Sequence, residues 1–135
     1  MGYPMICTDK TIQPKISFNL HKFVHTTINN HKQRGFKIKI AKQDLKILIN
    51  KALEEGCPYC GKPFNLEDSR SNFYPTIDIL NPQIREMSRD NIQILCQRCN
   101  KLKRNIPHLE FIEICNNITK RYFGNTYTKT YQKVG

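Results

Sequence analysis

Apolar residues recur along this chain with the two spacings that distinguish helices from strands. Spacings of three and four residues predict helices over 18–33, 42–55 and 108–122, with a shorter helix over 97–104. Alternation of apolar and polar residues predicts strands over 36–40, 76–80 and 92–95. Because helices and strands are mixed along the sequence, we predict an α+β fold.

The same pattern divides the chain into four parts. We expect an extended arm over 1–15 and a helix–strand–helix part over 16–56, with Ser17 as the N-cap of the first helix. A part framed by cysteines follows over 57–123, and its closing helix is expected to bury an apolar stripe of Phe111, Ile112, Cys115 and Ile118. The polar, basic residues 124–135 are expected to form a mobile tail.

Charge narrows the choice of partner. The 135 residues include 22 Lys and Arg against 11 Asp and Glu, which gives a net charge of +11. Since binding to a polyanion releases condensed counterions, we expect DNA as the partner, with RNA as the alternative. No apolar run approaches the length of a membrane span, and the first residues do not read as a myristoylation site or a signal peptide. We therefore expect no membrane partner and a cytoplasmic protein, which includes a nucleoid-associated or phage-encoded one.

Four of the six cysteines form two C-x₂-C pairs, Cys57 with Cys60 and Cys96 with Cys99. In each pair the two intervening residues let both thiolates face one point, and two such pairs supply the ligands of a tetrahedral zinc site. A disulfide framework is the alternative, but thiols stay reduced in the cytosol. Four thiolates leave no coordination position for water, so we expect a structural zinc. Cys57→Ser or Cys99→Ser should then collapse thermal stability.

Further motifs lie around the cysteine pairs: RGFKI at 34–38, CPYCG at 57–61, TIDILNP at 76–82, DNIQILC at 90–96 and CNKLK at 99–103. With these motifs the chain resembles the HNH endonucleases (His-Me finger, ββα-metal) in their four-cysteine, zinc-bound form. Phage-borne, intron-borne and restriction enzymes of this family share the pattern. The resemblance implies a ββα-metal core that is stapled by the zinc site and flanked by N- and C-terminal helices.

The resemblance also implies roles for three residues. Asp78 and Asn100 stand where the family binds a catalytic divalent metal, and two oxygen ligands suit Mg²⁺ or Mn²⁺. Asn91 stands where the family has an asparagine that orients the loop and the general base. The implied activity is metal-dependent hydrolysis of DNA, in which a monomer nicks one strand and a homodimer cuts both. Because that metal is catalytic, Asp78→Ala should leave thermal stability nearly intact.

The sequence departs from the family at residue 79, where the general-base histidine directly follows the aspartate. Ile79 stands there instead, and it cannot take a proton. Three residues are candidates for the missing base: Tyr59, Tyr74 and His108. We favour Tyr59, because a phenol beside a divalent cation and basic residues has a lowered pKa. The alternatives are a zinc module that binds nucleic acid without catalysis and a zinc domain that binds protein.

Basic residues around the predicted site are expected to contact phosphates. Two of them share one face of the predicted strand over 36–40, and four lie in or beside the short helix: Lys37, Lys39, Arg98, Lys101, Lys103 and Arg104. His21 and His25 have the spacing of metal ligands on a helix. No third ligand is in register with them, so we expect neither to bind a metal.

Overall fold

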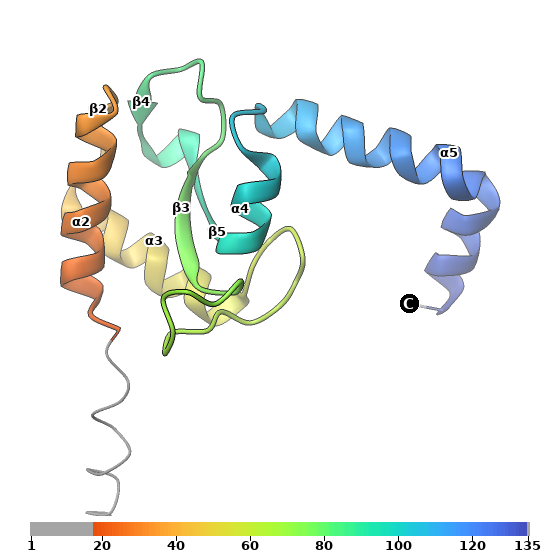
Figure 1. The fold of residues 1–135 in the computed structure, drawn as a ribbon, viewed down its shortest axis with the longest axis horizontal. Coiled ribbons are helices and arrows are strands. Elements are labelled where there is room, and N and C mark those ends of the chain that lie inside the picture. Colours follow the sequence, from red (N-terminus) through yellow and green to blue (C-terminus); the bar gives the residue numbers. More distant parts are fainter. Residues whose placement is uncertain (1–17, 135) are drawn as a thin grey trace, which may run out of the picture.

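The computed structural model describes the backbone of residues 18–134 and the side chains of residues 18–124. The expected arm over 1–15, Cys7 and the expected N-cap Ser17 lie outside the described residues. Helices and short strands are mixed along the chain, which confirms the α+β prediction (Figure 1). In order, the elements are α2 (Leu20–Gln33), β2 (Lys37–Ile38), α3 (Lys42–Glu55), β3 (Pro75–Ile79), β4 (Glu86–Met87), the 3₁₀ turn η2 (Arg89–Asn91), β5 (Ile92–Cys96), α4 (Gln97–Lys103) and α5 (His108–Val134).

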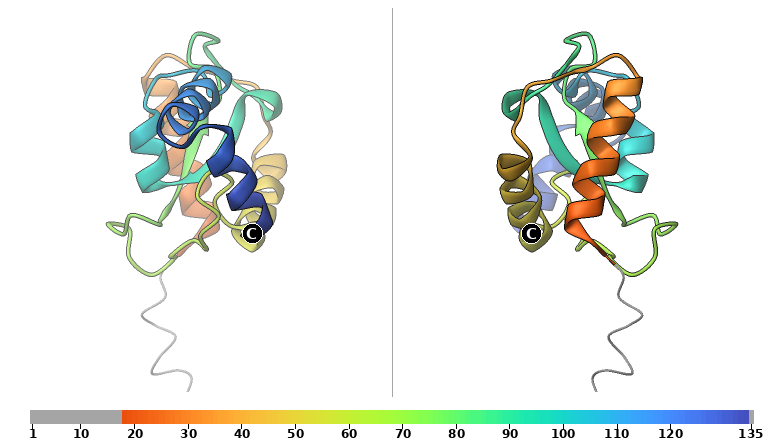
Figure 2. Two further views of the ribbon diagram at one scale, coloured as in Figure 1. Left: turned by 90° about the vertical axis from the view of Figure 1, so that its right-hand side faces the viewer. Right: turned by 90° about the vertical axis from the view of Figure 1, so that its left-hand side faces the viewer.

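An antiparallel hairpin of β3 and β5 separates an apolar core from a polar face. Ile77 pairs with Ile94 and Asp78 pairs with Gln93, so the isoleucines lie on one face of the hairpin, and Asp78 and Gln93 lie on the other. The isoleucines pack with residues of α2 and α3, whereas Asp78 bonds to Lys103 of α4. Two views at right angles to the first show these three helices arranged around the hairpin (Figure 2).

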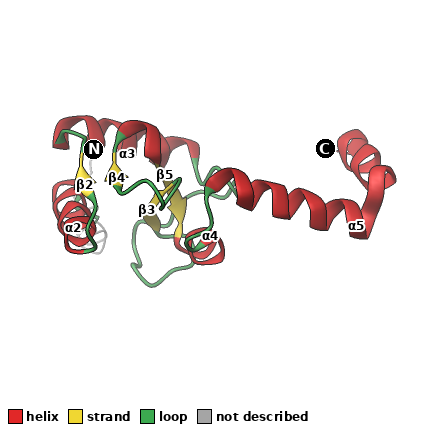
Figure 3. Cartoon of the chain, turned by 90° about the horizontal axis from the view of Figure 1, so that it is seen from above, coloured by secondary structure: helices red, strands yellow, loops and turns green. Residues whose placement is uncertain are grey.

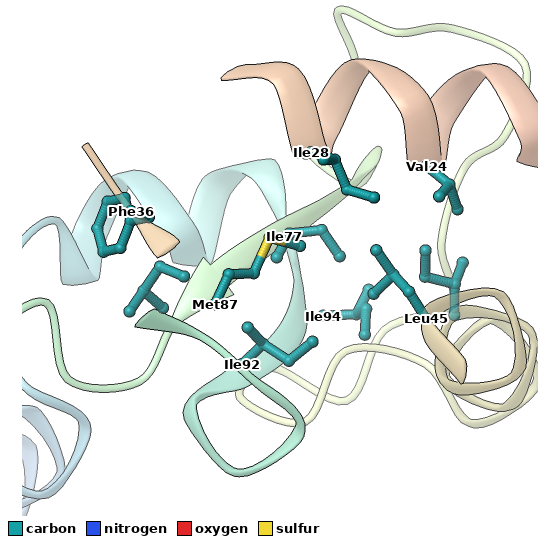
Figure 4. Close-up of a cluster of buried hydrophobic side chains, with 10 residues drawn as sticks. Val24, Ile28, Phe36, Leu45, Ile77, Met87, Ile92 and Ile94 are labelled. Atoms are coloured by element: carbon teal, nitrogen blue, oxygen red, sulfur yellow. The ribbon is translucent and has the colours of Figure 1, made fainter. Parts of the chain in front are cut away.

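The apolar core lies between the hairpin and the two N-terminal helices. From α2, Val24 and Ile28 point toward the hairpin residues, and Leu45 of α3 lies beside them (Figure 4). Each such side chain, when fully buried, stabilises a fold by about 1.5–3 kcal/mol. The core also includes Met87 of β4, which is fully buried. These contacts hold β3, and with it Asp78, against the N-terminal half of the chain.

The first helix begins and ends with local signals in the sequence. Its N-cap is Asn19, whose Oδ1 accepts a hydrogen bond from the backbone N–H of Lys22 at 3.0 Å. It is followed by Gly35, whose φ of 91° favours glycine. The chain then enters β2, which pairs in parallel with β4 over two residues only. The strand predicted over 36–40 is therefore shorter than expected.

The last helix corrects two expectations. Its predicted apolar stripe is largely exposed rather than buried, since Ile112 is 44% and Ile118 is 52% exposed and Cys115 is also exposed. Seen from above, α5 projects away from the remainder of the fold, which explains this exposure (Figure 3). The helix also continues to Val134 across a non-helical Gly124, so residues 125–134 of the expected tail have helical backbone. None of the helices in the described part is long and apolar enough to cross a membrane.

Candidate functional site

The two cysteine pairs come together as the spacing predicted. The sulfur atoms of Cys57, Cys60, Cys96 and Cys99 all lie within 4.8 Å of one another. Cys57 follows α3 directly, after Gly56, where φ is 88° and an added Cβ would lie 3.0 Å from a backbone carbonyl oxygen. Cys96 is the N-cap of α4, and its sulfur accepts a hydrogen bond from the N–H of Cys99 at 3.4 Å. A glycine turn and a helix N-terminus thus position the two pairs.

This cluster has the dimensions of a zinc site. Zn–S bonds of about 2.3 Å give a tetrahedron with edges of about 3.8 Å, and the sulfurs of Cys60 and Cys96 are 3.8 Å apart. Burial raises the pKa of the Cys96 and Cys99 thiols, so a cation is needed to hold them as thiolates. The four cysteines could therefore hold a metal ion such as zinc. Among the described residues no other cluster of three such ligands occurs.

Lys103 is buried, and its predicted contact with nucleic acid is wrong. Its side chain is 0% exposed, its Nζ lies 3.2 Å from Oδ2 of Asp78, and it donates to the carbonyl oxygen of Ile79 at 2.9 Å. Lys103 follows Asn100 by three residues, so both share the face of α4 that packs on β3. The ammonium group is therefore turned into the fold and neutralises Asp78.

Asp78 is the central acceptor on the polar face of the hairpin. It is 4% exposed, and its Oδ2 accepts a hydrogen bond from Nε2 of Gln93 at 3.0 Å. Burial raises the pKa of the Asp78 carboxyl, and the bond from Gln93 and the charge of Lys103 offset part of that rise. Gln93 was not predicted as a site residue. Alternation along β5 nevertheless places its side chain on the other face of the strand from the buried Ile92 and Ile94.

Gln93 also links Asp78 to two of the residues considered for the missing base. Its Nε2 donates to Oη of Tyr59 at 3.1 Å, and that oxygen lies 2.7 Å from Nδ1 of His108. The Tyr59 ring stacks on His108 and on Phe111. Burial raises the pKa of Tyr59, the bond from Gln93 offsets part of the rise, and the charge of Asp78 adds to it. Without a divalent cation beside it, the phenol of Tyr59 thus has a pKa above its ordinary value.

Tyr74 lies apart from this network. Its ring makes edge contacts with the rings of Phe18 and Phe23, with 6.1 and 6.5 Å between ring centroids. Burial raises the pKa of the Tyr74 phenol. It lines a cavity beside α2 that does not include Asp78. The structure thus brings Tyr59 and His108, but not Tyr74, into contact with the network of Asp78.

The side chain of Asn91 holds the loop that connects β3 to β4. Its Oδ1 accepts from the N–H of Asn81 at 2.9 Å, and its Nδ2 donates to the carbonyl oxygens of Asn81, Ile84 and Glu86 at 3.3, 3.2 and 2.9 Å. Asn91 is 6% exposed. These four contacts fix the path of the loop, because they bind backbone groups that strand pairing leaves free.

A cavity of about 260 Å³ lies beside β3, between the end of α2 and the end of α4. We call it the arginine cleft, after the residues that dominate its polar lining: His31, Arg34, Asp78, Arg85, Asn100, Arg104 and Asn105. Both residues predicted to bind a divalent metal, Asp78 and Asn100, line this cleft. The Nδ2 of Asn100 donates to Oγ1 of Thr76 at 2.8 Å, and no donor from the described residues reaches its Oδ1.

Three guanidinium groups give the cleft a positive charge. That of Arg85 lies 3.8 Å from the centre of the Phe36 ring and donates to the backbone carbonyl oxygen of Arg34. Arg104 has a φ of 54°, a conformation that non-glycine residues adopt only when their surroundings hold it. Within residues 18–124, no carboxylate forms a salt bridge with Arg34, Arg85 or Arg104. The cleft is therefore suited to an anion.

The basic residues predicted from sequence are only partly in this cleft. Arg104 lines it, whereas four others are exposed elsewhere: Lys37, Lys39, Arg98 and Lys101. Sequence reasoning missed Arg34 and Arg85, because nothing in the order of residues shows that the end of α2 meets the loop before β4. His21 and His25 are exposed and bond to Lys46 and Asn29, respectively.

His31 is a further residue of the cleft that sequence reasoning missed. It is 5% exposed and lies on the buried face of α2, together with Val24 and Ile28. The helical spacing of these three residues is a signal in the sequence that could have identified it as buried.

Comparison of the chain with protein-family models, with characterised proteins and with solved structures finds no match, so no family is shown.

Proposed function

We propose that this protein is a zinc-stabilised endonuclease of the HNH type, which hydrolyses phosphodiester bonds of DNA with Mg²⁺ or Mn²⁺ bound at Asp78 and Asn100. The observation that carries the proposal is the arginine cleft. These two oxygen donors line it together with three arginines that form no salt bridge with a carboxylate of residues 18–124. The order of β3, β5 and α4, with the cysteine cluster at their junction, supports a ββα-metal core.

The positive charge of the cleft fits a phosphodiester. Guanidinium groups donate paired hydrogen bonds that match the oxygens of a phosphate, and they keep their charge at any physiological pH. The net charge of +11 would attract a nucleic acid from outside the cleft as well. Exposed Lys37, Lys39, Arg98 and Lys101 would then contact the backbone on either side of the bound phosphate.

The oxygen donors of the cleft fit a divalent cation in kind. Mg²⁺ and Mn²⁺ prefer carboxylate and amide oxygens, and the Oδ1 of Asn100 receives no hydrogen bond from the described residues. When bound, such an ion would supply positive charge to the phosphate and the leaving oxygen. The Lys103 ammonium competes for the same carboxylate, 3.2 Å away, so metal binding requires that this ion pair loosens.

Zinc-loaded protein should nick supercoiled plasmid when Mg²⁺ or Mn²⁺ is added, and Asp78→Asn should slow nicking at least ~100-fold. Asparagine keeps one oxygen, which at the place of Oδ2 lies within reach of Gln93 and Lys103, but it lacks the charge that a divalent ion needs. Agarose gel electrophoresis of the plasmid measures the rate. Asp68→Asn, at an exposed loop position, is the matched control. The proposal is contradicted if the wild-type protein fails to nick plasmid with Mg²⁺ and with Mn²⁺. It is also contradicted if Asp78→Asn keeps full activity.

Arg34→Gln and Arg104→Gln should each weaken DNA binding and flatten its dependence on salt. Each lost phosphate contact lowers the slope of log K against log salt by about 0.9 for duplex DNA. Fluorescence anisotropy with a labelled duplex at several salt concentrations measures both quantities. Lys51→Gln on α3 is the control, because Lys51 is exposed and does not line the cleft. If both arginine variants keep the wild-type slope of log K against log salt, the DNA does not contact the arginine cleft.

Nucleic-acid binding without cleavage is the second candidate function, and the pair of Asp78 and Lys103 favours it. A buried ammonium already balances the carboxylate, and Ile79 offers no base. This function predicts salt-dependent binding that needs neither Mg²⁺ nor Mn²⁺, and plasmid that stays supercoiled. The nicking experiment above therefore separates the two candidates.

A further inference from the structure

The arginine cleft contains one group that can accept a proton near neutral pH, and it comes from the N-terminal helix. His31 lies on α2, 47 positions before Asp78 in the sequence, yet both residues line the cleft. Ile79 lines it as well. The wall of the cleft thus holds an imidazole beside the position where a histidine of the strand is missing.

The fold fixes which nitrogen of His31 carries its proton. Nδ1 lies 2.8 Å from the carbonyl oxygen of Thr27, one helical turn earlier. A carbonyl oxygen only accepts, so Nδ1 must donate, and a neutral ring then has its lone pair on Nε2. The ring is also held by an edge contact with Phe36, at 5.6 Å between centroids. His31 is therefore an oriented acceptor rather than a freely rotating side chain.

The surroundings of His31, burial first among them, favour its neutral form. Burial lowers the pKa of His31, the bond to Thr27 offsets part of this, and the charge of Arg34 lowers it further while that of Asp78 raises it. Arg85 and Arg104 face the same cleft from the loop before β4 and from the end of α4. A base must be unprotonated to act, and this environment keeps His31 so at neutral pH.

We propose that His31 is the general base of the cleft and supplies from α2 the histidine that is absent at residue 79. This inference rests on the proposed nuclease function. Nε2 of His31 takes one proton from a water molecule as the oxygen of that water bonds to phosphorus. The bond from phosphorus to the 3′-oxygen breaks, and that oxygen takes a proton from solvent. The products carry a 5′-phosphate and a 3′-hydroxyl.

Tyr59 and His108 are less suited to this step. Neither lines the arginine cleft, and the phenol of Tyr59 has a raised pKa, so it would ionise only far above neutral pH. A tyrosine base would make nicking climb with pH well above neutrality. With His31 as base, the rate rises through acidic pH and reaches its plateau near neutrality, because its pKa is lowered from 6.5.

The test replaces His31 by asparagine, whose Nδ2 can still donate to the carbonyl oxygen of Thr27. His31→Asn should slow nicking by ~100-fold or more, the usual share of a general base. Affinity for the labelled duplex and the melting temperature should stay near the wild-type values. Added imidazole should restore part of the activity, and the acidic limb of the pH profile should disappear. His25→Asn, an exposed position on the same helix, is the matched control and should keep full activity.

A second measurement does not depend on the variant. Nitrogen-15 NMR of the histidines in wild-type protein should show His31 with its proton on Nδ1, and its Nε2 signal should shift when a phosphorothioate duplex binds. A proton on Nε2, or full nicking activity of His31→Asn, overturns the inference and leaves the nuclease proposal standing. Wild-type protein that does not nick plasmid overturns both.

Discussion

Chelation of zinc should abolish the cooperative thermal unfolding of this protein. The four sulfurs join the end of α3 to the start of α4, and burial raises the pKa of the Cys96 and Cys99 thiols, so a bound cation is needed to hold these two as thiolates. Structural zinc contributes on the order of 10 kcal/mol in small zinc domains. That is comparable to the whole net stability of a domain, about 5–15 kcal/mol. Differential scanning calorimetry with and without chelator measures the loss.

The same result is expected from a change of one ligand. Cys99→Ser should lower the zinc content and remove the thermal transition, because Cys99 is 7% exposed and belongs to the cluster. Cys115→Ser is the matched control, since Cys115 is exposed and lies outside the cluster. A chelated protein that keeps the melting curve of the zinc-loaded protein would refute a structural role for the metal.

Asp78→Ala should lower the free energy of unfolding by about 3–5 kcal/mol, the usual cost of removing one partner from a buried ion pair. The substitution leaves the Lys103 ammonium buried, 0% exposed, without its carboxylate. The expectation from sequence, that this change leaves stability nearly intact, treated Asp78 as a metal ligand alone. Urea denaturation at a fixed zinc concentration measures the difference.

Two further variants separate the ion pair from other effects. Asp68→Ala removes a surface ion pair in which the Asp68 side chain is 54% and the Arg70 side chain 91% exposed. This change should alter the free energy of unfolding by no more than about 1 kcal/mol. Lys103→Met combined with Asp78→Ala should recover part of the loss, because no charge then remains buried at this place. A double variant as unstable as the sum of its two single variants would show that the pair is not the cause.

Helices that pack on the core were the elements most readily predicted. Both bounds of α3 match the prediction, since its stripe of Leu45 and Ile49 is regular and Gly56 ends it. The same reasoning failed for α5, because periodicity shows which residues share a face but not whether another element covers that face. In this structure Ile112 and Ile118, two residues of the predicted stripe, are exposed to solvent.

The candidate site was predictable to the extent that it depends on local spacing. Two C-x₂-C pairs predict the cysteine cluster directly, because each pair is a single turn. Lys103 was misjudged, since composition treats a lysine as solvated unless a buried carboxylate is known to face it. His31, Arg34 and Arg85 could not be assigned to one site, because their meeting depends on the packing of α2 against the loop before β4.

The arginine cleft has a consequence for how this molecule can be divided or recombined. Its carboxylate, from Asp78, lies on β3, and the amide of Asn100 lies on α4. His31, by contrast, comes from α2, and Arg34 is the C-cap of that helix. A zinc-bound core over 57–123 would carry the cysteine cluster and Asp78 with one wall of the cleft open to water. The N-terminal helix is thus a component of the site and not an accessory to it. Any chimaera that exchanges α2 for an unrelated helix would also replace one wall of the cleft.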